Sequence, residues 1–169
     1  PAPASFSTLF SHHLDVLNER LENALETTGY DSMVILAGNH QQIGRSDLSY
    51  PYWVEPHFTA WVPLSQNPGC VLRLTPAEKP LLVYVQPKNY WQETIPDPEG
   101  HWAQHFNIQI AETSDDALKM VTPTKMKKAF IGPNADNTGD SAVFNDPRLL
   151  NELNYFRAFK TDYEIKCIE

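Results

Sequence analysis

Histidine and carboxylate side chains are the first candidates for chemistry in this sequence. His101 and His105 stand four residues apart in HWAQH, a spacing that can place two imidazoles on one helix face as metal ligands. No carboxylate or third imidazole is placed to complete a tetrahedral shell, so we expect surface or packing roles for both. Asp115 and Asp116 fall where a helix would start, and complementarity to the helix dipole explains them without catalysis.

Motifs for other reaction types do not occur in the sequence. There is no Gly-x-Gly-x-x-Gly, phosphate loop, His-Glu-x-x-His or Cys-x-x-Cys, and no serine lies in a Gly-x-Ser-x-Gly elbow. His12 and His13 lie early in the first expected helix, and we interpret both as helix surface. The sequence therefore predicts no self-sufficient active site, no metal site and no cofactor in this chain.

Composition limits the classes of partner. The chain has 21 acidic and 13 basic residues, and its net charge of -8 opposes binding to the phosphate backbone of nucleic acid. No apolar run approaches the length that crosses a bilayer, so no membrane partner is expected. Cys70 and Cys167 lie far apart in sequence, which favours reduced thiols and a cytoplasmic location.

One segment, Asp47 to Pro63 (DLSYPYWVEPHFTAWVP), is unusually rich in aromatic residues. Its prolines predict an extended, stiffened loop in place of a helix. The interpretation we favour is a small hydrophobic core beneath a long loop, and the alternative is a surface for a partner or ligand. The aromatic side chains of the segment are Tyr50, Tyr52, Trp53, Phe58 and Trp61.

Apolar periodicity predicts the elements that must position these side chains. From Phe6 to Thr28 apolar residues recur at three- and four-residue spacing, which indicates a long amphipathic helix ended by Gly29. Met33 to Ala37 is a short apolar run typical of a buried strand. The residues expected on the buried face of the helix are Phe10, Leu14, Leu17, Leu21, Ala24 and Leu25.

The middle of the chain alternates short strands with turns. Pro68-Gly69 suits the centre of a type II turn, and short links favour antiparallel neighbours. A later strand, helix and strand form a crossover unit, so the predicted sheet is mixed, with about six strands. The expected strands are Phe58–Val62, Cys70–Leu74, Leu81–Gln86, Asn107–Ala111 and Lys128–Ile131, with a helix near Ser114–Val121.

Two helices are expected near the end of the sequence. Asp146 to Leu153 is helical, with Pro147 suited to the first turn. Thr161 and Glu164 form a capping-box pair that starts a second helix, and no stop signal follows before Glu169. We therefore expect a further domain after this helix.

Four groups of residues together resemble one family over nearly the whole chain. The aromatic segment from Tyr50 to Pro63 is followed by Tyr90-Trp91, Ile131-Gly132-Pro133 and the stretch from Tyr155 to Glu164. In this order and spacing they resemble the N-terminal domain of bacterial Xaa-Pro dipeptidases. These are prolidases of the pita-bread metallopeptidase group, related to organophosphorus acid anhydrolases.

The resemblance implies a division of labour. Residues 1–160 would form a non-catalytic, three-layer α-β-α domain of the creatinase N-terminal type, and residues 161–169 would begin a linker helix into a C-terminal pita-bread domain. The family holds two metal ions, typically manganese, in that second domain on two Asp, one His and two Glu ligands. The full-length protein would hydrolyse Xaa-Pro dipeptides, and this chain alone would be inactive.

The resemblance also implies a homodimer in which loops of this domain cover the partner's active site. Asp47 and Trp91 would border the substrate pocket of the partner subunit, and Tyr50, Tyr52 and Trp53 are interface candidates. Asp47 capping a turn is an equally open interpretation. The family usually has Asp-Asp where this chain has Ser-Asp, which makes the loop less acidic and leaves the substrate preference open.

Two alternatives stay open at this stage. The chain could be a stand-alone module whose aromatic loop binds a protein or peptide. It could also be the same domain from an organophosphate-hydrolysing or creatinase-like relative, which would share the fold and differ in the pocket.

Overall fold

The computed structural model describes residues 5–41, 43–44, 48–88, 95–122, 125–133 and 143–169. Its centre is a six-stranded sheet with strand order β4-β3-β2-β1-β5-β6. Only β2 runs antiparallel to its neighbours, so the sheet is mixed, as the sequence predicted. The strands are β1 (Ser32–Leu36), β2 (Val71–Leu74), β3 (Leu81–Val85), β4 (Asn107–Ala111), β5 (Lys128–Ile131) and β6 (Val143–Phe144).

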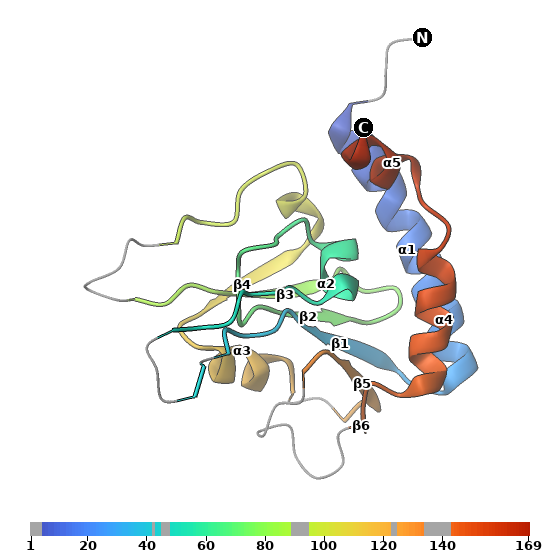
Figure 1. Ribbon diagram of the computed structural model, residues 1–169. Coiled ribbons are helices and arrows are strands. Elements are labelled where there is room, and N and C mark those ends of the chain that lie inside the picture. The colour runs from blue at the N-terminus through green and yellow to red at the C-terminus, as the bar shows by residue number, and fades with distance from the viewer. Residues whose placement is uncertain (1–4, 42, 45–47, 89–94, 123–124, 134–142) are drawn as a thin grey trace.

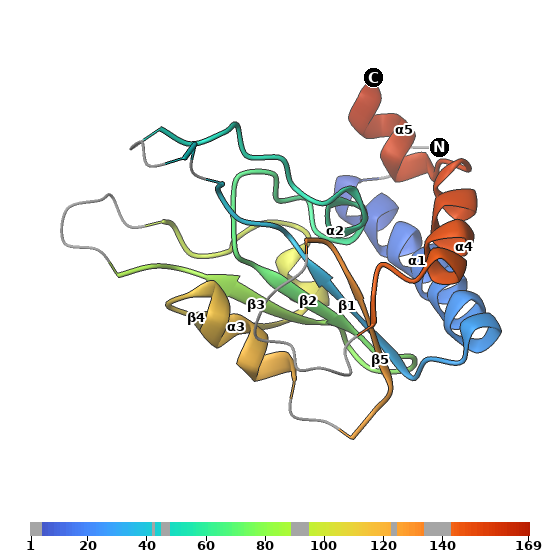
Figure 2. The same cartoon turned by 60° about the horizontal axis from the view of Figure 1, so that its bottom comes forward.

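Helices cover both faces of this sheet and complete three layers (Figure 1). On one face α3 packs on β2, β3 and β4. On the other face α2 packs on β1, and α1 packs against α4 and α5 (Figure 2). The helices are α1 (Phe6–Thr28), α2 (Pro56–Trp61), α3 (Ser114–Val121), α4 (Pro147–Arg157) and α5 (Asp162–Ile168), with a 3-10 turn, η1, at Ala103–His105.

Helix α1 confirms the amphipathic pattern. Ser5 caps its first turn by accepting a hydrogen bond from the backbone N–H of Thr8, and Gly29 ends it in the left-handed conformation with φ of 74°. All six apolar residues expected on its inner face are buried. These side chains form one continuous core with the apolar strands β1 and β3, whose residues are buried on both faces.

Capping residues determine where α4 and α5 begin. Asp146 accepts hydrogen bonds from the backbone N–H of Arg148, at 2.9 Å, and from the hydroxyl of Tyr30, at 2.8 Å. The expected capping box of α5 is present: Thr161 Oγ1 accepts from the N–H of Glu164, and Glu164 Oε2 accepts from the N–H of Thr161. Helix α4 continues to Arg157, four residues beyond its predicted end.

One predicted strand is wrong. Residues Phe58–Val62 were expected to be extended, whereas Pro56–Trp61 form helix α2. Pro56 occupies the first turn, where its missing N–H costs no hydrogen bond, and Glu55 accepts a hydrogen bond from the N–H of His57. The prolines therefore start a helix here, and only the part of the segment before Pro56 is an extended loop.

Among the residues that the structure describes, no helix has both the length and the apolar character needed to span a membrane. Cys70 is buried and Cys167 is exposed, and both are free thiols.

Candidate functional site

The carboxyl ends of β1 and β5 open onto a cavity of about 960 Å³. In open α/β sheets this edge is where ligands usually bind. Residues after β1, the start of α3 and the loop that leads into α2 form the walls of the cavity. We call residues 39–55, as far as the structure describes them, the aromatic arm.

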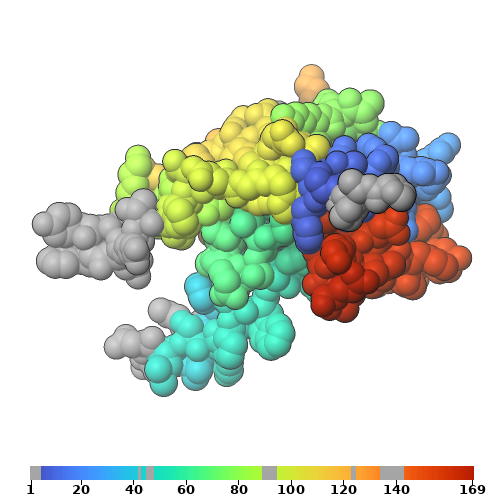
Figure 3. Space-filling view, turned by 90° about the horizontal axis from the view of Figure 1, so that it is seen from above, coloured from blue at the N-terminus to red at the C-terminus, as the bar shows by residue number. Residues whose placement is uncertain are grey.

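Backbone hydrogen bonds build the base of the aromatic arm. The N–H of Tyr50 donates to Gln41 O and that of Ile43 donates to Leu48 O, both at 2.8 Å, so two stretches of the arm run side by side. At its end the N–H of Glu55 donates to Ala37 O, just after β1. In the space-filling view the teal segment that contains the arm projects from the body (Figure 3).

The three interface candidates differ in their surroundings. Trp53 is 85% exposed and Tyr50 is 54% exposed, and both line the cavity. Tyr52 is half-buried, its hydroxyl donates to Ala37 O at 3.0 Å, and its ring lies 5.4 Å from that of His40. Burial raises the pKa of the Tyr52 phenol to about 12. Tyr52 therefore fixes the arm to β1, while Tyr50 and Trp53 remain available to a partner.

The aromatic segment divides between the main core and the surface. Phe58 and Trp61 lie on helix α2 and join the main core, so the expected separate small core beneath a loop is wrong, whereas Tyr50 and Trp53 are exposed. Sequence reasoning did not single out Leu48, another exposed apolar residue of the arm. The only signal for Leu48 was an apolar residue among polar neighbours in a loop.

Asp47 and Trp91, the residues expected to reach the partner's substrate pocket, lie outside the described residues. Their roles stay predictions.

Backbone close approach explains the Ile131-Gly132-Pro133 stretch at the same edge. Gly132 has φ of 121°, and a Cβ atom there would lie only 2.8 Å from Leu36 O at the end of β1. The side-chain amide of Asn145 holds this turn by exchanging hydrogen bonds with the N–H and C=O of Gly132. Glycine is therefore needed for β5 to leave the sheet beside β1, with Pro133 lining the cavity.

Two polar groups that line the cavity have structural explanations. Cys70 lies at its floor, and burial raises the pKa of the thiol to about 11, so the thiolate is scarce at neutral pH. Asp115 lies in the first turn of α3 beside Asp116, whose N–H is capped by Thr113, which agrees with the helix-start interpretation. Across the described residues, no three His, Cys, Asp or Glu side chains gather as metal ligands.

His101 and His105 pack against Phe10 in the first half of α1. His101 and His105 do not share a helix face, because only His105 lies in the short η1 turn. Both rings pack edge-on against Phe10 of α1, at 5.3 Å and 5.5 Å, and Tyr163 of α5 joins the cluster. The packing role expected for the pair is therefore confirmed.

The expected position of His13 was wrong. His12 is exposed, but His13 is 2% exposed and joins three elements. Its Nδ1 lies 2.7 Å from Thr161 Oγ1 at the start of α5, and its Nε2 lies 2.7 Å from Ala60 O in α2. Burial lowers the pKa of the imidazole, so the neutral ring donates to Ala60 O and accepts from the Thr161 hydroxyl.

A comparison with solved structures concerns the fold. A Bacillus anthracis protein described as an aminopeptidase P has a similar fold, with a TM-score of 0.59 and 15% identity over 95% of this chain and 42% of that one. This likeness confirms the expected α/β fold with a mixed six-stranded sheet.

The sequence comparisons then define the family. The family model described as "Xaa-Pro dipeptidase, N-terminal domain" matches residues 8–155, so the chain belongs to this family. A Xaa-Pro dipeptidase of Xanthomonas campestris pv. campestris is 39% identical over 95% of this chain, and one of Pseudoalteromonas haloplanktis is 32% identical over 96%. The chain covers 36% and 37% of these two relatives.

Proposed function

We propose that this chain is the non-catalytic N-terminal part, residues 1–160, of a cytoplasmic Xaa-Pro dipeptidase, with residues 161–169 beginning the link to a pita-bread catalytic domain. The match to the family model over residues 8–155 carries this proposal. Similar proteins that extend well beyond the matched region bear the name Xaa-Pro dipeptidase. The catalytic domain would hold two divalent metal ions, with manganese favoured because carboxylate-rich ligand sets suit it.

The aromatic arm would serve a homodimer in this proposal. Trp53 and Tyr50 present a large apolar surface on a loop that backbone hydrogen bonds hold in place. Aromatic side chains of this kind anchor protein interfaces because they bury much area with little loss of conformational freedom. The arm of each subunit would contact the other subunit near its active site.

Asp47 would then contribute to substrate selection across the dimer interface. A carboxylate at the rim of the partner's pocket would bind the free ammonium group of a dipeptide through charge-assisted hydrogen bonds. Longer peptides have no ammonium group at that distance and would collide with the loop. The residues beside the two metal ions would cleave the bond, with a bridging hydroxide as nucleophile.

Kinetics of the full-length enzyme test this role. Asp47→Ala should raise KM for Xaa-Pro dipeptides about tenfold or more with a smaller change in kcat, because a charge-assisted contact to the substrate is lost. Asp15→Ala, which removes an exposed carboxylate of α1, is the matched control and should leave KM unchanged. Unchanged KM in the Asp47 variant would favour the turn-capping role.

Two measurements on the isolated chain test the assignment of roles. With added manganese the chain should show no dipeptidase turnover, and measurable turnover would contradict a non-catalytic domain. Light scattering at high protein concentration should show a dimer if the arm carries much of the subunit contact. A strictly monomeric chain would assign the contact to the remainder of the protein.

A further inference from the structure

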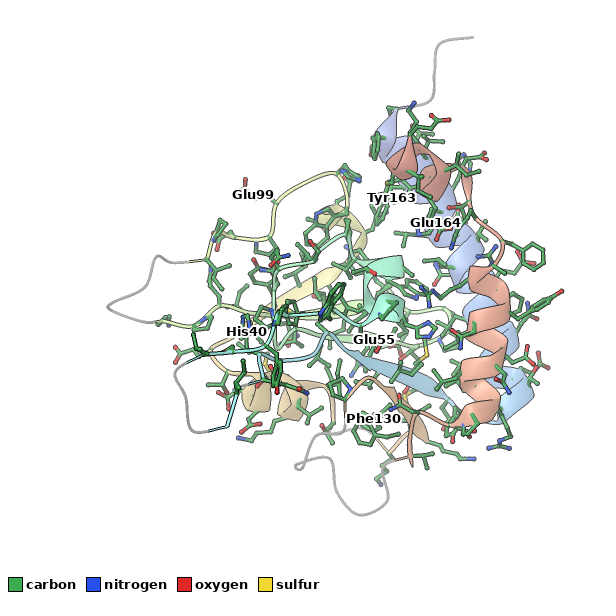
Figure 4. All side chains as sticks on the ribbon, viewed as in Figure 1. His40, Glu55, Glu99, Phe130, Tyr163 and Glu164 are labelled. Atoms are coloured by element: carbon green, nitrogen blue, oxygen red, sulfur yellow. The ribbon has the colours of Figure 1, made fainter. Side chains whose placement is uncertain are left out.

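The cavity beside the aromatic arm is acidic. Its lining includes two carboxylates, those of Glu55 at the start of α2 and of Asp115 in the first turn of α3 (Figure 4 labels Glu55). No lysine, arginine or histidine is among the described residues that line it. A concave surface with charges of one sign concentrates their field in its opening, so this cavity favours a positively charged group.

Neither of these two carboxylates has a cationic partner among the residues that the structure describes. The Glu55 carboxylate accepts one hydrogen bond there, from the backbone N–H of His57 at 3.3 Å, and Asp115 forms no ion pair. The neighbouring Asp116 differs, because Lys119 Nζ lies 3.4 Å from its carboxylate. Glu55 and Asp115 therefore bring two uncompensated negative charges to one cavity.

Two glycines form the floor between the arm and α3. The N–H of Gly69 donates to Gly38 O at 2.7 Å, which joins the loop before β2 to the loop after β1. A Cβ atom on Gly69 would lie 3.1 Å from Ser114 Cβ in α3. One on Gly38 would lie 3.6 Å from Trp53 O in the arm. Both walls therefore border a floor without side chains, and the cavity of about 960 Å³ is large enough for a long side chain.

Two aromatic rings at the same cavity favour one kind of cation. Tyr50 and Trp53 line it and are both exposed. An indole ring attracts a cation placed over its face, and a planar guanidinium also stacks on it. A carboxylate binds a guanidinium through two parallel hydrogen bonds, which a lysine ammonium cannot form. Exposed rings and free carboxylates around one opening therefore suit an arginine side chain.

We propose that this cavity receives an arginine side chain of the partner subunit. Its guanidinium lies against Trp53 and pairs with Glu55 or Asp115. The inference rests on the proposed role of the arm in a homodimer and adds the chemistry of the group that the arm contacts. Each copy of this chain has a net charge of -8, so two copies repel at long range. A local pair of opposite charges offsets this repulsion and fixes the register of the contact.

Dimer dissociation of the full-length protein tests the proposal. Glu55→Gln combined with Asp115→Asn removes both charges, and glutamine keeps the acceptor for the N–H of His57. The dissociation constant should rise at least about tenfold, measured by sedimentation. Added salt should weaken this variant less than wild type, because fewer opposite charges remain to be screened. Glu22→Gln, which removes an exposed carboxylate of α1 outside the cavity, is the matched control and should leave the constant unchanged.

A small ligand tests the cavity in the isolated wild-type chain, whether or not a variant folds. N-acetyl-arginine amide should give saturable NMR shifts of the Trp53 indole N–H and of the Glu55 and Asp115 amides. N-acetyl-citrulline amide has nearly the same shape without the charge, and it should bind at least about tenfold more weakly. The Glu55→Gln and Asp115→Asn substitutions together should remove this preference.

Two outcomes would overturn the proposal. A dimer weakened by Trp53→Ala but unchanged by loss of both carboxylates would keep the arm as the contact and exclude the arginine. Equal affinity for the arginine and citrulline derivatives would mean that the cavity does not recognise the charge. Full dimer affinity in Trp53→Ala would instead contradict the proposed role of the arm itself, so the two failures are distinguishable.

Discussion

The two sides of α2 differ in exposure. Trp53, in the aromatic arm that leads into the helix, is 85% exposed, whereas Trp61, the last residue of the helix, is 5% exposed within the core. The arm end uses backbone hydrogen bonds to hold an apolar surface outward. The other end is tied by His13, which links Ala60 of α2 to the capping box of α5 (Figure 4 labels Tyr163 and Glu164 of that helix). One short helix therefore joins a surface available for contacts to a junction fixed by buried polar groups.

The largest expected effect is at the buried end. Trp61→Ala should lower the free energy of unfolding by about 4 kcal/mol, because it removes a large core side chain and leaves a cavity in its place. Urea denaturation of the isolated chain measures this value. A loss below about 1 kcal/mol would mean that the core refills around the gap and that the two ends of α2 differ less than their exposure indicates.

The polar link of the same end comes next. His13→Ala should cost about 3 kcal/mol, because it creates a cavity and leaves Ala60 O and the Thr161 hydroxyl without their partner. His12→Ala is the matched control, and as an exposed substitution it should stay within about 0.5 kcal/mol of wild type. Equal, small effects of the two substitutions would contradict a structural link through His13.

Acid should weaken the packing of α2, because His57 is buried in the first turn of this helix. Burial lowers its pKa to about 4 in the folded chain from 6.5 when unfolded, so its stabilising effect is present above pH 6.5 and is lost as pH falls toward 4. This histidine alone should account for about 2 kcal/mol between pH 7 and pH 5. The lowered pKa of His13 acts in the same direction.

The acid effect is measured by urea denaturation across this pH range. His57→Gln should reduce the pH dependence, because glutamine does not titrate. The same slope in variant and wild type would assign the acid loss to other groups.

The exposed end should give the smallest change in stability. Trp53→Ala should alter the free energy of unfolding by less than about 0.5 kcal/mol, because little of the indole is buried. In the full-length protein the same substitution should weaken the dimer at least about tenfold, as measured by sedimentation or light scattering. Full dimer affinity in this variant would exclude the arm as a main contact.

Much of the fold could be predicted because its signals are local. Gly29 ends α1, and the pair Thr161 and Glu164 starts α5 through groups only three residues apart. Short links and the crossover unit predicted a mixed sheet of about six strands. Helix α2 was missed because the prolines of the segment were interpreted as excluding a helix, although a proline in the first turn, as in Glu55-Pro56, is itself a helix-start signal.

The candidate sites were less predictable. The sequence singled out the aromatic segment but did not distinguish Tyr52 from Trp53. The hydroxyl of Tyr52 donates a hydrogen bond to Ala37 O just after β1, whereas Trp53 is exposed. Nothing in the local sequence marks His13, Ala60 and Thr161 as neighbours, because they come from three parts of the chain that lie far apart in sequence. Burial of this kind depends on which helix face meets which strand.

By itself the sequence determined the long helix, most strands, the caps and the family, since each depends on residue types at short, fixed spacings or on the order of motifs. The tertiary structure decided which polar groups are buried. His13 looks like a surface residue beside His12, yet its ring is hydrogen-bonded to the hydroxyl of Thr161, which lies far away in the sequence. Only the packing of α1 against α2 and α5 creates that environment, because two buried hydrogen bonds must offset the cost of removing an imidazole from water.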